Sequence, residues 1–187
     1  APFRGIPQGA MKGRMNQTCS AMGRVQLKYY PQRIQEIQDS INYFWDLLKD
    51  VPGLHPHRPD MWENSTMGGW YYAQALYRAE ELGGVNIDLF SRAMNAEGVK
   101  NTAPGGNSPL HIHPYFTQSD LFRLGKPTAI AFGQRDVRQK QGDLPVSESI
   151  HDICIAIPWF KHFDKPVIKM YADAFRKVAE NVEQLKG

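Results

Sequence analysis

The sequence predicts a small α/β (α+β) fold in which about three strands form a sheet covered by helices. Two segments, residues 32–51 and 164–185, place apolar residues at helical spacing along one face. Short apolar and aromatic runs, typical of buried strands, alternate with the helical segments. With 187 residues, 42% of them hydrophobic and 22% charged, the chain can bury a sizeable core as one soluble globular domain.

The chain is expected to begin with two helices. Asn16 can cap the first helix, and Pro31 is expected to end it after Tyr30. The second helix covers residues 32–51 and ends at Pro52, which is followed by glycine. Its apolar positions follow one face of a helix, so we expect this face to be buried.

The remaining elements are expected in the order strand, helix, strand, short helix, loop, helix, strand and helix. They span residues 70–77, 87–96, 99–102, 118–124, 125–142, 145–152, 153–157 and 164–185. The loop carries a mixed-charge run and is expected to be exposed. The pattern therefore places the sheet strands at residues 70–77, 99–102 and 153–157.

The segment from residue 107 to 116, Asn-Ser-Pro-Leu-His-Ile-His-Pro-Tyr-Phe, is the strongest candidate for a functional site. Its two prolines exclude a regular helix or a central strand. His111 and His113 alternate around Ile112, so an extended backbone would point both imidazoles the same way. Histidines held in this way can transfer protons or bind metal. The alternative is a surface loop with two ordinary histidines.

Charge and composition exclude several classes of function. The net charge is +3 with no long basic run, which gives no support for nucleic-acid binding. No apolar run is long enough to span a bilayer and no signal peptide is visible, so we expect no membrane association and a cytoplasmic location. Cys19 and Cys154 lie far apart in apolar-looking segments and are expected to be buried, reduced thiols.

A second pair of histidines, His55 and His57, surrounds a proline. Such a pair can supply two zinc ligands, but a zinc site needs a third or fourth ligand. Together with His111 and His113 it defines an alternative hypothesis, a His-based metal-binding domain. A non-catalytic binding or dimerisation module is the other alternative.

Three stretches together resemble a known family. Gly13-Arg-Met-Asn-Gln-Thr18 runs into residues 21–27, Pro109-Leu-His-Ile-His-Pro-Tyr115 follows, and Asp143-Leu-Pro-Val-Ser-Glu148 leads to a strand. In this order and spacing they resemble the C-terminal part of the DegT/DnrJ/EryC1/StrS family of pyridoxal-phosphate-dependent aminotransferases, which act on keto sugars and cyclitols. The resemblance covers about residues 10–185.

The resemblance implies that residues 14–187 are the small C-terminal domain of a fold-type I aminotransferase. Residues 1–13 would be a loop or linker from a large N-terminal domain. That domain would bind most of the pyridoxal 5′-phosphate and supply the lysine that holds it covalently. No lysine here matches that motif, so the isolated chain is expected to be inactive, because transamination needs this amine. The implied protein is a homodimer with shared active sites, in which an amino acid donates its amino group to a keto sugar or cyclitol.

The resemblance also assigns roles to particular residues, with no metal ligand among them. His111 falls on the histidine of the family's Pro-Leu-His loop and is the catalytic candidate. The cofactor-binding candidates are Lys12, Arg14 and Asn16, which can offer fixed donors to the phosphate. The substrate-binding candidates are His113 and Tyr115. The chain departs from the family pattern at positions that include Lys12, Gln17, His113, Trp159 and Phe160.

Overall fold

A computed structural model describes residues 15–58, 67, 70–106 and 108–186. The chain divides into two compact units. The larger unit contains residues 16–106 and 151–187, and the smaller unit contains residues 1–15 and 107–150. Lys12, Arg14 and the predicted linker of residues 1–13 lie outside the described residues.

The larger unit contains a three-stranded antiparallel sheet, which confirms the predicted fold class. The strands are β1 (Leu54–Pro56), β2 (Gln74–Tyr77) and β3 (Cys154–Ala156), and β2 lies in the centre. Leu54 pairs with Tyr77, and Leu76 pairs with Cys154. The sheet therefore joins segments that are far apart in the sequence.

Two of the predicted strands were placed incorrectly. Residues 99–102 form no strand, because the Val99 N–H closes helix α2 on Met94 and Asn101 has a φ of 68°, outside the range of a strand. Its place in the sheet is taken by β1, in a segment for which no strand was predicted. The strand predicted at 70–77 begins only at Gln74, because Trp70 has a φ of 45°.

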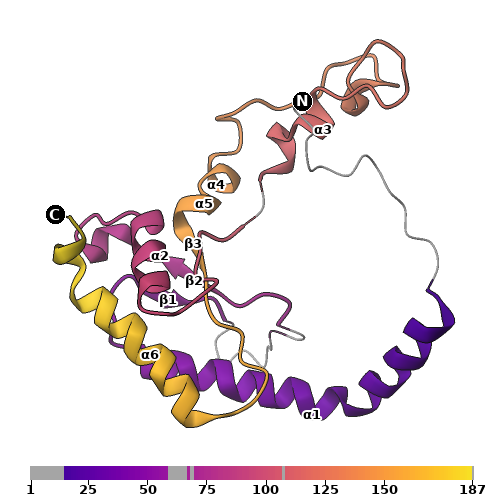
Figure 1. Cartoon of the computed structure of the whole chain (residues 1–187). Coiled ribbons are helices and arrows are strands. Elements are labelled where there is room, and N and C mark those ends of the chain that lie inside the picture. Colours follow the sequence, from indigo (N-terminus) through magenta and orange to yellow (C-terminus); the bar gives the residue numbers. More distant parts are fainter. Residues whose placement is uncertain (1–14, 59–66, 68–69, 107, 187) are drawn as a thin grey trace. The chain divides into compact units, whose positions relative to one another are not determined.

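Three longer helices pack around this sheet. They are α1 (Gln17–Leu47), α2 (Ile87–Ala96) and α6 (Lys165–Glu180), which is followed by a 3-10 turn at Val182–Lys186. Figure 1 shows α6 beside the second half of α1, and the two helices are in contact. The rings of Phe44, Phe90 and Phe175, one from each helix, are fully buried and form the centre of the core.

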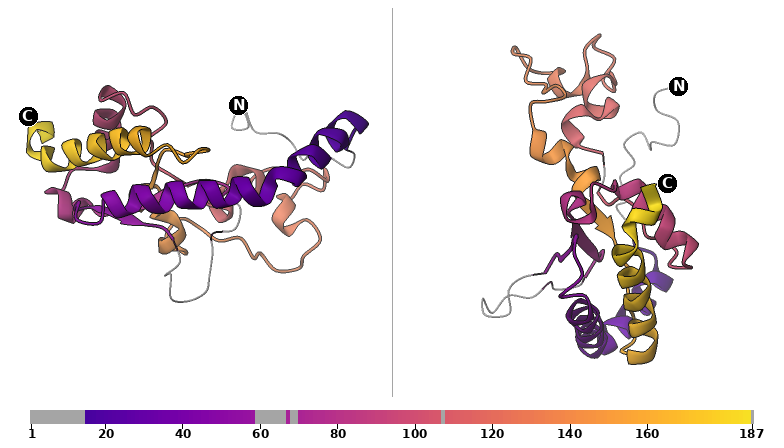
Figure 2. Two further views of the ribbon diagram at one scale, coloured as in Figure 1. Left: turned by 90° about the horizontal axis from the view of Figure 1, so that it is seen from below. Right: turned by 90° about the vertical axis from the view of Figure 1, so that its left-hand side faces the viewer.

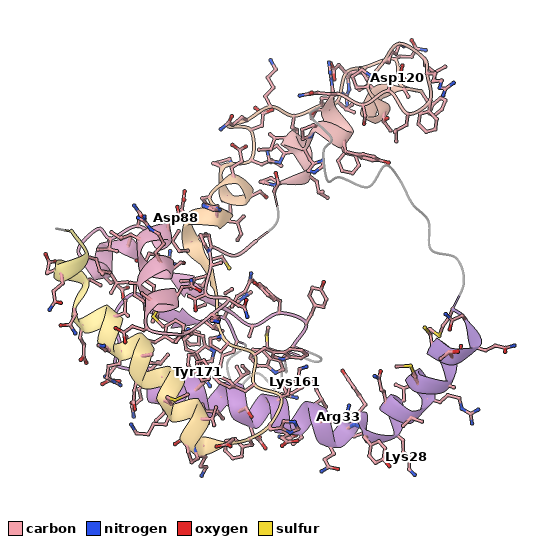
Figure 3. The ribbon with its side chains drawn as sticks, viewed as in Figure 1. Lys28, Arg33, Asp88, Asp120, Lys161 and Tyr171 are labelled. Carbon is pink, nitrogen blue, oxygen red and sulfur yellow. The ribbon has the colours of Figure 1, made fainter. Side chains whose placement is uncertain are left out.

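Pro31 does not end the first helix, contrary to the prediction, but lies inside a single helix of 31 residues. Proline lacks an N–H group and its ring collides with the carbonyl four residues earlier, so a long helix can continue through it with a kink. Helix α1 bends between Lys28 and Arg33, as Figures 2 and 3 show. The second half, where Ile37, Ile41 and Phe44 are buried, is held by the core.

Replacing Pro31 with alanine is expected to stabilise α1, because it restores a helical hydrogen bond and removes a clash. The gain in the free energy of unfolding should be up to about 3 kcal/mol. Urea unfolding followed by far-ultraviolet circular dichroism measures it. Gln32→Ala, at the exposed next position, is the control and should change stability by less than about 0.5 kcal/mol. Lower stability of Pro31→Ala would mean that packing requires the bend.

The smaller unit is built from short turns of helix. They are a 3-10 turn at Leu110–Ile112, α3 (Pro114–Thr117), a 3-10 turn at Thr128–Ile130 and α4 (Pro145–Glu148). The helix predicted over residues 145–152 is divided, since α5 (Ile150–Ile153) begins separately and leads into β3. Residues 118–124 are not helical, because the Asp120 carboxylate accepts the N–H groups of Leu124 and Gly125 and forms a turn.

The two cysteines differ in their surroundings. Cys154 is buried in β3, and burial raises the pKa of its thiol. Cys19 is exposed, so the prediction of burial was wrong for this residue. The reason is that it lies in the first half of α1, where the side chains are largely exposed. Within the described residues, no helix has the length and apolarity needed to cross a membrane.

Candidate functional site

The candidate site in the smaller unit is organised by a hydrogen bond between the side chains of His111 and Glu148. Nε2 of His111 lies 2.8 Å from Oε1 of Glu148. Only 8% of the histidine side chain and 15% of the glutamate side chain are exposed. Pro109 and Pro114 bracket the 3-10 turn that carries His111, and their restricted φ angles fix the turn on both sides. The imidazole is therefore held in one orientation.

The Glu148 carboxylate also holds the backbone of its own loop. It accepts N–H groups from Gly142, at 2.9 and 2.7 Å, and from Leu144, at 3.2 Å. The hydrogen bond from His111 and these backbone donors lower the pKa of Glu148, so it is ionised at neutral pH. Nδ1 of His111 has no hydrogen-bond partner in the part of the chain that the structure describes. That nitrogen is the atom available to a ligand or a transferred proton.

The sequence predicted that His111 and His113 would point the same way on an extended backbone. The backbone around His111 is instead a 3-10 turn, so the basis of that prediction was wrong. His113 instead caps α3, and its Nδ1 accepts the N–H of Tyr115 at 3.2 Å. The ring of Tyr115 packs edge-on against Phe116. Both candidates for substrate binding therefore have local structural contacts.

An open pocket of about 550 Å³ lies beside His111. Its walls are mainly apolar and include Leu110, Phe116 and Val137. Arg138 also lines it, and its guanidinium donates to Asp136, with the shortest contact at 2.6 Å, and to the Thr117 carbonyl at 3.1 Å. Arg138 lowers the pKa of Asp136 to about 2. The pocket thus combines an apolar surface, the imidazole of His111 held in one orientation, and the guanidinium of Arg138, whose charge is paired with Asp136.

Of the three cofactor-binding candidates, only Asn16 is described. It is exposed, and its Oδ1 accepts the N–H of Cys19 at 2.7 Å, which caps α1. The cap leaves its amide NH₂ group as the donor available for a phosphate.

The pocket beside His111 does not by itself fit pyridoxal phosphate. A complete site needs a lysine amine for the aldehyde carbon and unpaired donors for the phosphate. No lysine is among the residues that line this pocket, and Arg138 is engaged by Asp136. These residues can contact one side of a ligand and move a proton through His111, but they cannot hold the cofactor covalently.

The structure gives no support to the metal-binding alternative. The described residues contain no group of three or more His, Cys, Asp and Glu side chains that could hold a metal ion. Nε2 of His55 lies 2.9 Å from the Glu81 carboxylate, which also accepts the Gly53 N–H at 2.8 Å. These contacts lower the pKa of Glu81 and fix the start of β1 against the turn after β2.

Sequence reasoning missed two residues of the site. Glu148 lies in the Pro-Val-Ser-Glu stretch that carried part of the resemblance, so its motif was a signal that could have identified it. Arg138 lies in a mixed-charge run that indicated only an exposed loop. No local pattern distinguishes it from its charged neighbours.

Comparison with known proteins identifies relatives of the chain. The model of the DegT/DnrJ/EryC1/StrS aminotransferase family matches residues 6–176. No curated protein matches the sequence significantly.

Solved aminotransferase structures have the same fold. DesV from S. venezuelae, solved in complex with a ketimine intermediate, is 17% identical with a TM-score of 0.61, and the match covers 93% of this chain and 42% of DesV. DesI, solved in the presence of its TDP-sugar product, is 20% identical with a TM-score of 0.61 and coverages of 92% and 38%. An aminotransferase from Psychrobacter cryohalolentis is 18% identical with a TM-score of 0.64 and coverages of 93% and 41%. The chain thus spans less than half the length of each protein.

Proposed function

The chain belongs to the DegT/DnrJ/EryC1/StrS aminotransferase family, whose members depend on pyridoxal phosphate, and we propose that it forms the C-terminal part of such an enzyme. The observation that carries the proposal is the family match over residues 6–176, nearly the whole chain. In this proposal residues 14–187 are the small domain and residues 1–13 link it to a large N-terminal domain. The enzyme is a cytoplasmic homodimer with shared active sites.

The proposed reaction transfers an amino group from an amino acid to a keto sugar or cyclitol. The family membership supports this class of reaction, and DesI, a structural neighbour, was solved with a TDP-sugar product. When bound, pyridoxal phosphate would supply the electron sink that transamination needs. The large domain would supply the lysine, consistent with a pocket whose lining has no lysine.

In this enzyme His111 would face the bound ligand, with Glu148 fixing its ring. Its Nδ1 atom, which has no partner in the described structure, would donate or accept a proton or hydrogen-bond a substrate oxygen. His113 and Tyr115 would contact the substrate from the same segment. Lys12, Arg14 and Asn16 would bind the cofactor phosphate, the first two as cations.

Exposed apolar side chains on the first half of α1 support the proposal of a covering partner. Met22, Val25 and Leu27 are all more than half exposed, and Tyr29 and Tyr30 are nearly so. Soluble monomers rarely leave such a group of large apolar side chains uncovered. A large domain or a second subunit packed on this helix would bury them.

The proposal predicts that the isolated chain forms no Schiff base with pyridoxal phosphate, because the lysine needed for it lies outside residues 1–187. The measurement is the absorbance spectrum of the purified chain after addition of the cofactor and removal of the excess. The control is the full-length gene product, which should keep the bound cofactor and show the absorbance band of a lysine Schiff base. A stoichiometric band from the chain alone would contradict the proposal, and its absence from both proteins would favour a non-catalytic module.

A further inference from the structure

Residues 119–128 of the smaller unit form a closed loop. Thr128 ties its two ends together, because its N–H and its hydroxyl both donate to the Ser119 carbonyl at 2.7 Å. The same hydroxyl oxygen accepts the N–H of Leu121 at 3.1 Å. The loop therefore has a fixed base that is formed entirely by its own residues.

The turn within this loop is fixed by the carboxylate of Asp120, which Figure 3 labels. It accepts the N–H of Leu124 at 3.0 Å and that of Gly125 at 2.7 Å. The negative charge is thus directed at the backbone of the loop. Because these N–H groups already have partners within the loop, they can leave water without losing a hydrogen bond. Arg123, between them and Asp120, has a φ of 55°, a strained conformation that is found mainly at functional segments.

Large apolar side chains are exposed on this loop and just after it. The rings of Phe122 and Phe132 are 50% and 76% exposed, and their centres lie 4.8 Å apart. Leu121 and Leu124 are 39% and 50% exposed. Soluble proteins rarely leave such a group of side chains uncovered unless it binds something. These four side chains are called the apolar tip below.

The charged groups that accompany the apolar tip are cations. Arg123, Lys126 and Arg135 are exposed, and none of them makes an ion pair within the described part of the chain. The carboxylate of Asp120, the only one in residues 118–135, is bonded to the backbone. The apolar tip and its cations therefore match a surface that is apolar inside and negatively charged at its boundary.

We propose that the apolar tip docks on the surface of a lipid bilayer that contains anionic lipids. Its phenylalanine and leucine side chains enter the boundary between headgroups and acyl chains, and the three cations contact the headgroups. The bonded N–H groups of the loop favour this occupant over an acidic protein surface, since the acyl region offers no partner to a free N–H.

The proposal goes beyond the proposed function and does not rest on it. The cytoplasmic leaflet, which a cytoplasmic enzyme would meet, carries anionic lipids. The sequence predicted no membrane association because it lacks an apolar run long enough to span a bilayer. A loop that docks on the surface needs no such run.

Sedimentation of the full-length gene product with lipid vesicles tests the proposal. One set of vesicles is phosphatidylcholine, and the other contains about one third phosphatidylglycerol, which is anionic. The full-length protein is used because the exposed apolar side chains of α1 would bind vesicles in the isolated chain. Binding should be at least about tenfold tighter to the anionic vesicles, because each cation near such a surface contributes about fivefold.

Variants of the tip should separate its two contributions. The double variant Phe122→Asp and Phe132→Asp should weaken binding to anionic vesicles about tenfold or more. Lys126→Ala should weaken it about fivefold, and less in added salt. Two matched controls should bind as the unaltered protein does. They are Val146→Asp, at a valine of the same unit that is 80% exposed, and Lys169→Ala, at a lysine that already pairs with a carboxylate.

Two results would overturn the proposal. The first is no tighter binding to anionic than to neutral vesicles, which would leave an acidic protein surface as the partner of the tip. The second is equal binding of the double variant and the unaltered protein, which would place the lipid contact elsewhere. Thermal unfolding checks the fold of each variant, and Lys126→Ala tests the same loop independently if the double variant does not fold.

Discussion

Replacing His111 with asparagine in the full-length protein is expected to lower the transamination rate about 100-fold, the usual contribution of a positioned acid or base. Asparagine keeps a polar group of similar reach but cannot carry a proton between atoms. Glu148→Gln should have a smaller effect, roughly tenfold, because it removes the carboxylate that orients the imidazole and leaves the imidazole in place. Rates are measured under single-turnover conditions, so that product release does not limit them.

The same pair also has a pH signature in the stability of the fold, which a purely structural contact would show as well. The pKa of Glu148 is lowered from its ordinary value of 4.5 by the hydrogen bonds that its carboxylate accepts, so these contacts stabilise the fold above that value. This stability is lost as the pH falls through the lowered pKa. The difference in unfolding temperature between the unaltered protein and Glu148→Gln should therefore shrink in acid. If both variants change stability and neither changes the rate, His111 only braces its loop and the catalytic role is refuted.

Replacing Phe175 with alanine is expected to lower the free energy of unfolding by about 3–5 kcal/mol. Phe175 is fully buried in α6, and its ring centre lies 5.5 Å from that of Phe44 and 6.4 Å from that of Phe90. Alanine would leave a cavity where α1, α2 and α6 meet, and the rigid neighbouring rings can fill little of it. Urea unfolding of the isolated chain gives the value.

Met170→Ala is the control for Phe175→Ala, because Met170 lies on the exposed face of the same helix. Its effect should stay within about 0.5 kcal/mol. A loss below about 1 kcal/mol for Phe175→Ala would contradict the described core, since no buried phenylalanine between two packed rings costs so little to remove.

The parts of the fold that could be predicted are those in which one segment carries its own signal. Helix α2 was predicted with its bounds, Ile87–Ala96, because its cap, apolar stripe and terminating glycine are all local. Strand β3 is a short apolar run before a proline, and it lies where the sequence placed it. Helix α6 was identified by its apolar face, although its last predicted turn is a separate 3-10 turn.

The errors in the fold arose where distant contacts override local preference. Strand β1 has the sequence Leu-His-Pro, whose local preference is for a turn. It forms a strand only because it pairs with β2. Pro31 is a strong local signal for a helix end, yet α1 continues through it and the far half is held by the core.

The candidate site shows the same limit. His111 could be identified from its motif, but its partner Glu148 lies 37 residues away, and no spacing rule predicts that their side chains meet. The open pocket beside them also depends on Val137 and Arg138, which come from a loop with no regular pattern.

The central proposal is that the catalytic lysine lies outside this chain, and covalent labelling tests it most directly. Full-length protein loaded with pyridoxal phosphate is reduced with borohydride, which fixes the cofactor to its lysine, and the labelled peptide is identified by mass spectrometry. The proposal predicts a single pyridoxyl-lysine outside residues 1–187. A stoichiometric label on any lysine within residues 1–187 would contradict it.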